Sequence, residues 1–279
     1  MTHPVFTPGK AAVITGGASG IGLAAAIRFA ALGLKLCLVD MGADRLEAAR
    51  TQILSATPDA EVRVAEVDVS DRQALDGLAA ILTGDWGGVD VLMNNAGIGG
   101  KGDVLGSADY WRSVLEVNLW GVINGVQAFA PAMIDSGRAG LIINTGSKQG
   151  ITTPPGNPAY NVSKAGVKVF TEALEHQLRN TPGSRITAHL LIPGFVHTGM
   201  TGEAGGEKPA GAWTSGQTVD FMMSCLSRGD FYILCPDNDV SRELDEKRMK
   251  WAMEDVIENR PPLSRWHPDW AEAFKASLN

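Results

Sequence analysis

The sequence predicts an α/β fold in which a doubly wound parallel sheet of seven strands carries helices on both faces. Two observations lead to this prediction. Seven short apolar runs alternate with longer segments in which apolar residues recur at helical spacing. A parallel connection requires a crossover helix, and a sheet covered on both faces explains why the runs lack polar alternation.

The apolar runs set the expected strands. Each is short enough for a strand and apolar on both faces, as a buried parallel strand requires. The expected strands are 11–15, 35–39, 62–67, 89–94, 140–145, 185–192 and 230–234.

The segments between these runs predict the helices. The first is Ala-rich and ends in Gly33, a usual stop residue, and the third opens with Asp71 in its first turn. The expected helices are 21–33, 45–54, 71–82, 107–137 and 158–180. With no internal repeat or interior linker, residues 1–279 are expected to form one domain, with a core at 8–198, a Gly-rich flap at 199–216 and a C-terminal extension at 236–279.

Composition and charge exclude several classes of partner. The formal net charge is −7 and no long basic run occurs, so nucleic acid is not expected. Cys37, Cys225 and Cys235 are far apart and lie in apolar stretches, which indicates free buried thiols and a cytoplasmic protein, with no metal site. No secretion signal or stretch of 18 apolar residues is present, so no membrane association is expected. The charged run 241–250 alternates in sign, which is typical of a solvated helix face.

A glycine-rich turn, TGGASGIG at 15–22, follows the first expected strand and opens the first helix. Gly16, Gly20 and Gly22 allow a tight turn in which backbone N–H groups, with Ser19 and Ile21 between the glycines, approach a pyrophosphate at the helix N-terminus. In isolation a plain strand–helix turn is about as good an interpretation. The strand before, the helix after and the acid downstream favour a dinucleotide.

That acid is Asp40, which ends the second strand and is placed to accept hydrogen bonds from ribose hydroxyls. A carboxylate there repels a 2′-phosphate, so NAD is predicted as the cofactor. Arg45 is nearby in sequence, and we interpret it as a surface arginine. Asp68 and Val69 follow the third strand and could contact adenine, although on spacing alone an Asp that begins a turn is the stronger interpretation.

With NNAG at 94–97, the ordered set of motifs resembles the short-chain dehydrogenase/reductase family over about residues 8–235. The resemblance implies a single Rossmann-like domain and assigns Asn95, Ala96 and Gly97 to the segment that borders the adenosine ribose and stabilises the sheet. The remaining motifs are Asn118, Ser147, YNVSK at 160–164 and PGFVHT at 193–198.

The resemblance also implies roles for these residues. The family's catalytic tetrad corresponds to Asn118, Ser147, Tyr160 and Lys164, with Tyr160 and Lys164 also contacting the cofactor. The loop that holds the nicotinamide corresponds to Pro193, Gly194, Val196 and Thr198. Substrate contacts are expected from Gln149, Phe195, Met200 and Trp213.

The expected chemistry is hydride transfer coupled to proton transfer at oxygen. Tyrosine titrates near pH 10 when free, so a base at neutral pH needs Lys164, one helical turn away, to favour its ionised form. Taken alone, a Tyr and a Lys four residues apart are more often a helix surface pair. A Ser147 hydroxyl would stabilise charge on the substrate oxygen. The resemblance further implies that a local helix distortion lets the backbone carbonyl of Asn118 hold a water that relays protons from Lys164.

These residues favour an NAD-dependent alcohol dehydrogenase or ketone reductase, acting on an apolar or aromatic small molecule. The alternative is a dinucleotide-sensing regulator that binds NAD without turnover. The resemblance suggests a homodimer or homotetramer built through helices 107–137 and 158–180. The tail contains Trp251, Trp266 and Trp270, which are expected to pack it onto the body or onto another subunit rather than to bind substrate.

Overall fold

The structure, a computed structural model, describes residues 3–201 and 207–278. Residues 202–206, in the middle of the expected flap, lie outside the described part. Seven strands form one sheet in the order β3-β2-β1-β4-β5-β6-β7, and every neighbouring pair is parallel. The predicted fold class is therefore confirmed.

The strands lie within two residues of the apolar runs that predict them. They are β1 (Ala11–Thr15), β2 (Lys35–Asp40), β3 (Val62–Glu66), β4 (Val91–Asn94), β5 (Gly140–Thr145), β6 (Ile186–Ile192) and β7 (Tyr232–Leu234). The strand order reverses direction between β1 and β4, and in open parallel sheets ligands bind at such a switch point, outside the carboxyl ends of the strands.

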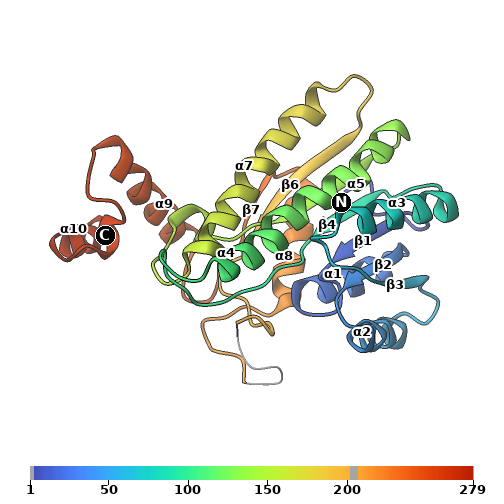
Figure 1. Cartoon of the computed structure of the whole chain (residues 1–279), viewed down its shortest axis with the longest axis horizontal. Coiled ribbons are helices and arrows are strands. Elements are labelled where there is room, and N and C mark those ends of the chain that lie inside the picture. The colour runs from blue at the N-terminus through green and yellow to red at the C-terminus, as the bar shows by residue number, and fades with distance from the viewer. Residues whose placement is uncertain (1–2, 202–206, 279) are drawn as a thin grey trace.

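Two layers of helices cover the sheet (Figure 1). One apolar cluster joins the sheet to α1 (Gly20–Ala31), α2 (Ala43–Ala56) and α8 (Ser215–Arg228). A second cluster joins the other face to α3 (Arg72–Trp86), α5 (Gly121–Asp135) and α7 (Pro158–Asn180). Because both faces are buried in this way, the strands can be apolar throughout.

The long helix expected at 107–137 is interrupted. It consists of α4 (Ala108–Leu115), a π-helical turn (Glu116–Trp120) and α5, and Asn118 lies inside the π turn. By length and apolar composition alone the continuous run Ala108–Asp135 could cross a membrane, but half of its most apolar window is buried inside the fold. The α5 half packs on the sheet, which accounts for its apolar sequence.

The C-terminal extension projects from the body as an arm that contains α9 (Arg242–Ile257) and α10 (Ala271–Ser277) (Figure 1). Trp251 packs edge-on against Trp270 and Phe274, and the Arg260 guanidinium lies 4.1 Å from the centroid of the Trp251 ring. In these contacts Trp251 and Trp270 pack within the tail itself, and the expected packing of the tail onto the body or onto another subunit is not seen in them. The prediction of a fully solvated face at 241–250 is wrong at Asp245, which is buried.

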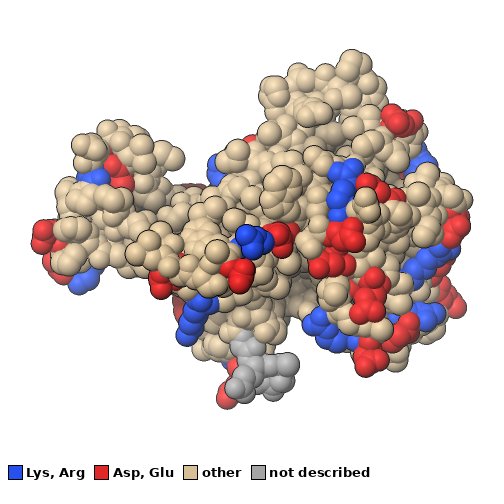
Figure 2. Space-filling view, viewed as in Figure 1, with Lys and Arg blue, Asp and Glu red and all other residues tan. Residues whose placement is uncertain are grey.

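On the face shown in Figure 2, Lys and Arg side chains are interspersed with Asp and Glu over the half that contains α2 and α3. This face therefore has no continuous basic surface of the kind that phosphate backbones require. Among the described residues, no three His, Cys, Asp or Glu side chains are grouped as metal ligands.

Candidate active site

The glycine-rich turn lies at the carboxyl end of β1 and is closely packed. Gly16 and Gly20 have φ values of +64° and +54°, in the left-handed region that favours glycine. A Cβ on Gly22 would lie 2.1 Å from the carbonyl oxygen of Gly16, and one on Gly16 would lie 2.8 Å from the Cα of Ala96. Only glycine fits these positions, and the turn leads directly into the N-terminus of α1, which suits a pyrophosphate.

The segment at 94–97 supports this turn from the neighbouring strand. The Thr15 hydroxyl accepts hydrogen bonds from the N–H groups of Asn95 (2.9 Å) and Ala96 (3.1 Å). The Asn95 amide donates to the carbonyl of Gly16 at 3.3 Å. These contacts tie the segment after β4 to the end of β1, which matches the stabilisation of the sheet that the resemblance implies for this segment.

Asp40 holds the glycine-rich turn through its carboxylate. Its carboxylate accepts the N–H of Ala18 at 3.0 Å and that of Met41 at 2.8 Å. Arg45 is a surface arginine, as predicted, with its side chain 62% exposed, but its Nη2 lies 3.4 Å from Oδ1 of Asp40 and also donates to the carbonyl of Met41. A cation therefore stands beside the acid that would discriminate against a 2′-phosphate.

Asp68 uses its carboxylate to form a turn. Oδ1 accepts the N–H and the hydroxyl of Ser70 at 2.9 and 2.8 Å. Val69 is buried and packs under Gly121, where a Cβ would approach it to 2.6 Å. The turn interpretation of Asp68 is the one that these contacts match.

Tyr160 lies near the start of α7, whose first turn is capped by Asn157. The Asn157 side chain accepts the N–H of Tyr160 at 3.3 Å and the hydroxyl of Tyr110. Burial raises the pKa of the Tyr160 phenol above its ordinary value, and an interaction with the Ser147 side chain partly offsets this. The expected lowering of the Tyr160 pKa is therefore not found in the protein alone.

Lys164 is one turn further along α7 and is buried. Its Nζ atom donates to the carbonyl of Thr145 at 2.8 Å and lies 5.7 Å from the centroid of the Tyr160 ring. Burial lowers the pKa of Lys164 to about 8. The two residues are thus not a helix surface pair, because the lysine points into the protein at the end of β5.

Asn118 is fully buried in the π turn, so the expected local distortion is present. Its amide pairs with the backbone of Ile98, accepting the N–H at 2.7 Å and donating to the carbonyl at 2.9 Å. A Cβ on Gly97 would lie 3.3 Å from Oδ1 of Asn118 and 3.8 Å from Nζ of Lys164, so these groups meet at one place.

The loop at 193–198 packs against the glycine-rich turn and against Lys148, the residue that follows Ser147. A Cβ on Gly20 would lie 3.2 Å from the Thr198 methyl group, and the carbonyl of Pro193 accepts the N–H of Lys148 at 3.3 Å. Val196 is buried, and a Cβ on Gly194 would lie 2.5 Å from a carboxylate oxygen of Asp237. The loop thus bridges the glycine-rich turn and the segment after Ser147.

The four candidate substrate residues divide into two groups. Phe195, Gln149 and Met200 are exposed, and a Cβ on Gly99 would lie 3.1 Å from Cγ of Met200. Trp213 instead packs its ring against Phe221 of α8, with 5.7 Å between centroids, while its backbone pairs with Val196. The Trp213 side chain thus belongs to the packing of α8.

Several residues of the site were given no role from the sequence, although Thr15 and Asn94 belong to the motifs at 15–22 and 94–97. They are polar groups at the ends of apolar strands or in the loops that follow: Thr15, Asn94, Asn144, Thr145 and Asn157. Asn94 donates to Asn144 at 2.8 Å, and Asn144 donates to Thr171 at 3.1 Å, which ties β4, β5 and α7 together. The sequence signal that could have identified them is a polar residue at the end of an otherwise apolar strand.

A doubly wound sheet with a glycine-rich turn at its switch point, and a Ser–Tyr–Lys group beside it, defines a dinucleotide-dependent oxidoreductase site. The short chain dehydrogenase family matches residues 10–208. The chain belongs to the short-chain dehydrogenase/reductase family.

Solved structures and curated relatives resemble the chain to different extents. A short-chain dehydrogenase/reductase of Burkholderia phymatum in complex with NAD is 32% identical, with a TM-score of 0.82 over 92% of this chain and 97% of the other. A metagenomic short-chain oxidoreductase in complex with NADP is 28% identical, with a TM-score of 0.68 over 82% and 98%. The putative oxidoreductase SadH of Mycobacterium tuberculosis is 41% identical over 172 residues, which is 61% of each chain and less than two thirds of that relative.

Proposed function

We propose that the protein interconverts a secondary alcohol and a ketone, with NAD as hydride carrier and Tyr160 as general acid and base. The observation that carries this proposal is the arrangement of Tyr160, Lys164 and Ser147. The phenol interacts with the Ser147 side chain, while Lys164 is anchored behind it on the carbonyl of Thr145. All three are at the carboxyl end of the sheet, next to the glycine-rich turn.

The residues of this site have separate tasks. A bound nicotinamide dinucleotide would accept or supply the hydride. Ser147 would hold the substrate oxygen by a hydrogen bond and stabilise charge on it. Tyr160 would pass its proton to a ketone oxygen or take one from an alcohol, and the Lys164 ammonium would stabilise the phenolate that results.

NAD is preferred in this proposal because Asp40 presents a carboxylate where a 2′-phosphate would lie. The similarity to an NAD-bound relative supports it, while the NADP-bound relative and the nearby Arg45 make cofactor preference a question for experiment. Exposed Phe195 and Met200 beside the site support an apolar or aromatic substrate.

The assembly and compartment are also proposed. Exposed apolar side chains on the helices that the family uses for association, Trp120, Val162 and Val169, support a homodimer or homotetramer. Three buried free cysteines support a cytoplasmic location.

A panel of secondary alcohols and ketones tests the function, with NAD and NADP in parallel and reduced nicotinamide followed by absorbance. We expect turnover of at least one apolar or aromatic pair with NAD. Dinucleotide binding without turnover of any pair, by wild type and Tyr160→Phe alike, would favour a sensing role instead.

A further inference from the structure

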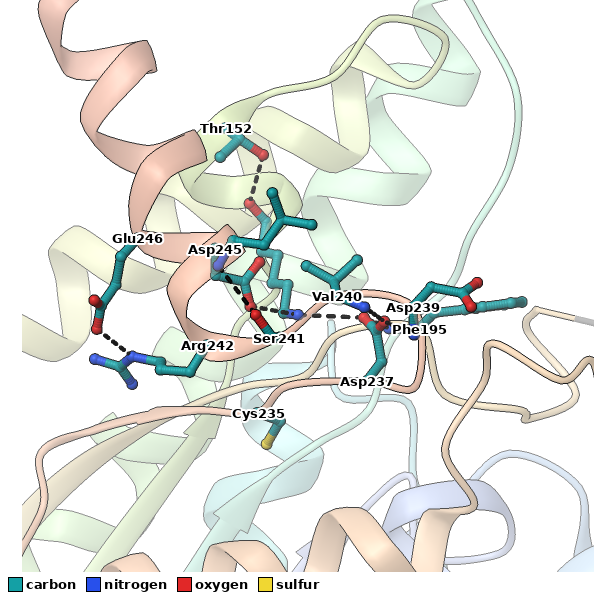
Figure 3. Close-up of polar contacts among 12 residues, drawn as sticks. Thr152, Phe195, Cys235, Asp237, Asp239, Val240, Ser241, Arg242, Asp245 and Glu246 are labelled. Atoms are coloured by element: carbon teal, nitrogen blue, oxygen red, sulfur yellow. Dashed lines mark hydrogen bonds and ion pairs between the residues drawn. The ribbon is translucent and has the colours of Figure 1, made fainter. Parts of the chain in front are cut away.

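A second group of buried charges lies directly behind the site. Lys148 follows Ser147 in the chain, whereas Asp237 and Asp245 come after β7, from a loop and from the first turn of α9. Their side chains are 16%, 4% and 7% exposed. Figure 3 shows Asp237 and Asp245 facing one another, with Phe195 beside Asp237.

One ammonium group serves both carboxylates. Nζ of Lys148 donates to Oδ2 of Asp237 at 3.2 Å and lies 2.6 Å from Oδ2 of Asp245. Desolvation of buried ions commonly cancels the Coulombic gain, so such a cluster is weak evidence for stability alone. Its contacts instead indicate a role in fixing neighbouring groups.

Asp237 connects the cluster to the loop at 193–198. Oδ2 accepts the N–H of Phe195 at 3.1 Å, while Oδ1 accepts the N–H groups of Asp239 (3.1 Å) and Val240 (2.8 Å). The carboxylate thus fixes the middle of the loop relative to the turn that leads into α9.

Lys148 contacts the same loop beside Asp237. Its backbone N–H donates to the carbonyl of Pro193 at 3.3 Å, and a Cβ on Gly194 would lie 2.8 Å from its Nζ atom. Because Lys148 is bonded directly to Ser147, the position of the loop and that of the Ser147 backbone depend on one set of contacts.

We propose that Lys148, Asp237 and Asp245 are positioning residues, which hold the loop at 193–198 in register with Ser147 so that the nicotinamide half of the cofactor is bound. The cluster makes α9 of the C-terminal extension part of the active-site support. This inference rests on the proposed function, because that function places the nicotinamide against this loop.

The experiment compares the binding of NAD with the binding of ADP-ribose, because the two ligands share the adenosine half. NAD has both the adenosine and the nicotinamide halves, whereas ADP-ribose lacks the nicotinamide and relies on the glycine-rich turn and Asp40. We expect Lys148→Met to weaken NAD binding at least about tenfold, roughly one charge-assisted hydrogen bond, and to change ADP-ribose binding less than about twofold, both by calorimetry.

Lys10→Met is the matched control. Lys10 also pairs with a buried carboxylate, Asp90, at 3.0 Å, but near the opposite end of the sheet. The Lys10→Met variant should have a lower melting temperature, while the ratio of its affinities for NAD and ADP-ribose should be unchanged. Should Lys148→Met fail to fold, Asp237→Asn, which replaces one oxygen by NH₂, takes its place in the comparison.

Parallel weakening of both ligands, or a lower melting temperature with both affinities intact, would overturn the positioning role. A wild-type protein that binds neither NAD nor NADP would instead refute the proposed function. If wild type binds only NADP, the same comparison is made with NADP and 2′-phospho-ADP-ribose, and the positioning role is tested unchanged.

Discussion

The Nζ atom of Lys164 lies 2.8 Å from the carbonyl oxygen of Thr145, the last residue of β5. This contact anchors the ammonium group of α7 at the end of the sheet, two residues before Ser147. The Lys164 ammonium keeps N–H donors that this hydrogen bond does not use, and its positive charge is held on the side of Tyr160 that faces the protein interior. One hydrogen bond therefore connects the lysine that supports proton transfer to the carboxyl end of β5.

The direct test of this chemistry is Tyr160→Phe. Loss of the hydroxyl removes the proton donor and leaves the ring that packs near Lys164, so we expect kcat to fall about 10²- to 10⁴-fold. The dissociation constant of NAD should stay within about threefold of wild type, because the turn and Asp40 are untouched. Turnover equal to wild type, measured with the same alcohol, would exclude Tyr160 as the acid and base.

Cofactor preference depends on Asp40 and Arg45 together. In Asp40→Ser the repelling carboxylate is gone and Arg45, no longer paired at 3.4 Å, is free to meet a 2′-phosphate. We expect kcat/KM for NADP relative to NAD to rise about 10- to 100-fold, the range of one charge-assisted hydrogen bond. Adding Arg45→Met should remove most of this gain. An equal gain in the double variant would show that Arg45 takes no part.

The glycine-rich turn gives a paired prediction on stability and binding. A methyl group on Gly22 would collide with the Gly16 carbonyl, so Gly22→Ala should lower the free energy of unfolding by about 1–3 kcal/mol and abolish saturable NAD binding. Gly77, inside α3, has open space around its Cβ position, so Gly77→Ala should stabilise by about 0.5–1 kcal/mol without affecting binding. Denaturant titration and calorimetry measure both, and NAD binding retained by Gly22→Ala would speak against the turn as the phosphate site.

The sequence predicted well whatever depends on local pattern. Apolar run length defined the strands, and the family motifs placed Tyr160 and Lys164 on α7. The contacts missed are those between residues far apart in the chain. Asp245 lies in an alternating charge run that is typical of a solvated face, and only the fold brings it to Lys148, 97 positions earlier.

The electrostatic environment of Tyr160 and Lys164 was the second feature that the sequence did not predict. Spacing places Lys164 near Tyr160 and suggests a lowered phenol pKa. Burial instead raises the pKa of Tyr160 and lowers that of Lys164, because it disfavours the charged form of each group. The extent of burial follows from the packing of α7 on the sheet, which periodicity alone does not specify.

Burial of Lys164 leads to a prediction about stability and pH. Its pKa falls from 10.5 in an exposed setting to about 8, a difference that corresponds to roughly 3 kcal/mol of unfavourable free energy when both states carry the charge. Lys164→Met removes that cost and one hydrogen bond, worth about 1 kcal/mol. At pH 7 the variant should therefore be the more stable protein by about 2 kcal/mol, although inactive.

The sign of the pH dependence follows from proton binding. Below pH 8 the lysine is charged in both the folded and the unfolded state, so the full cost is present. Between pH 8 and 10.5 the folded state has lost its proton while the unfolded state keeps it, so the stability of wild type rises with pH relative to the variant. Urea denaturation of both proteins at pH 7 and about pH 9.5 should show the advantage of Lys164→Met shrinking by at least about 1 kcal/mol. An advantage that stays constant, or grows, would mean that Lys164 does not titrate at a lowered pKa in the folded protein.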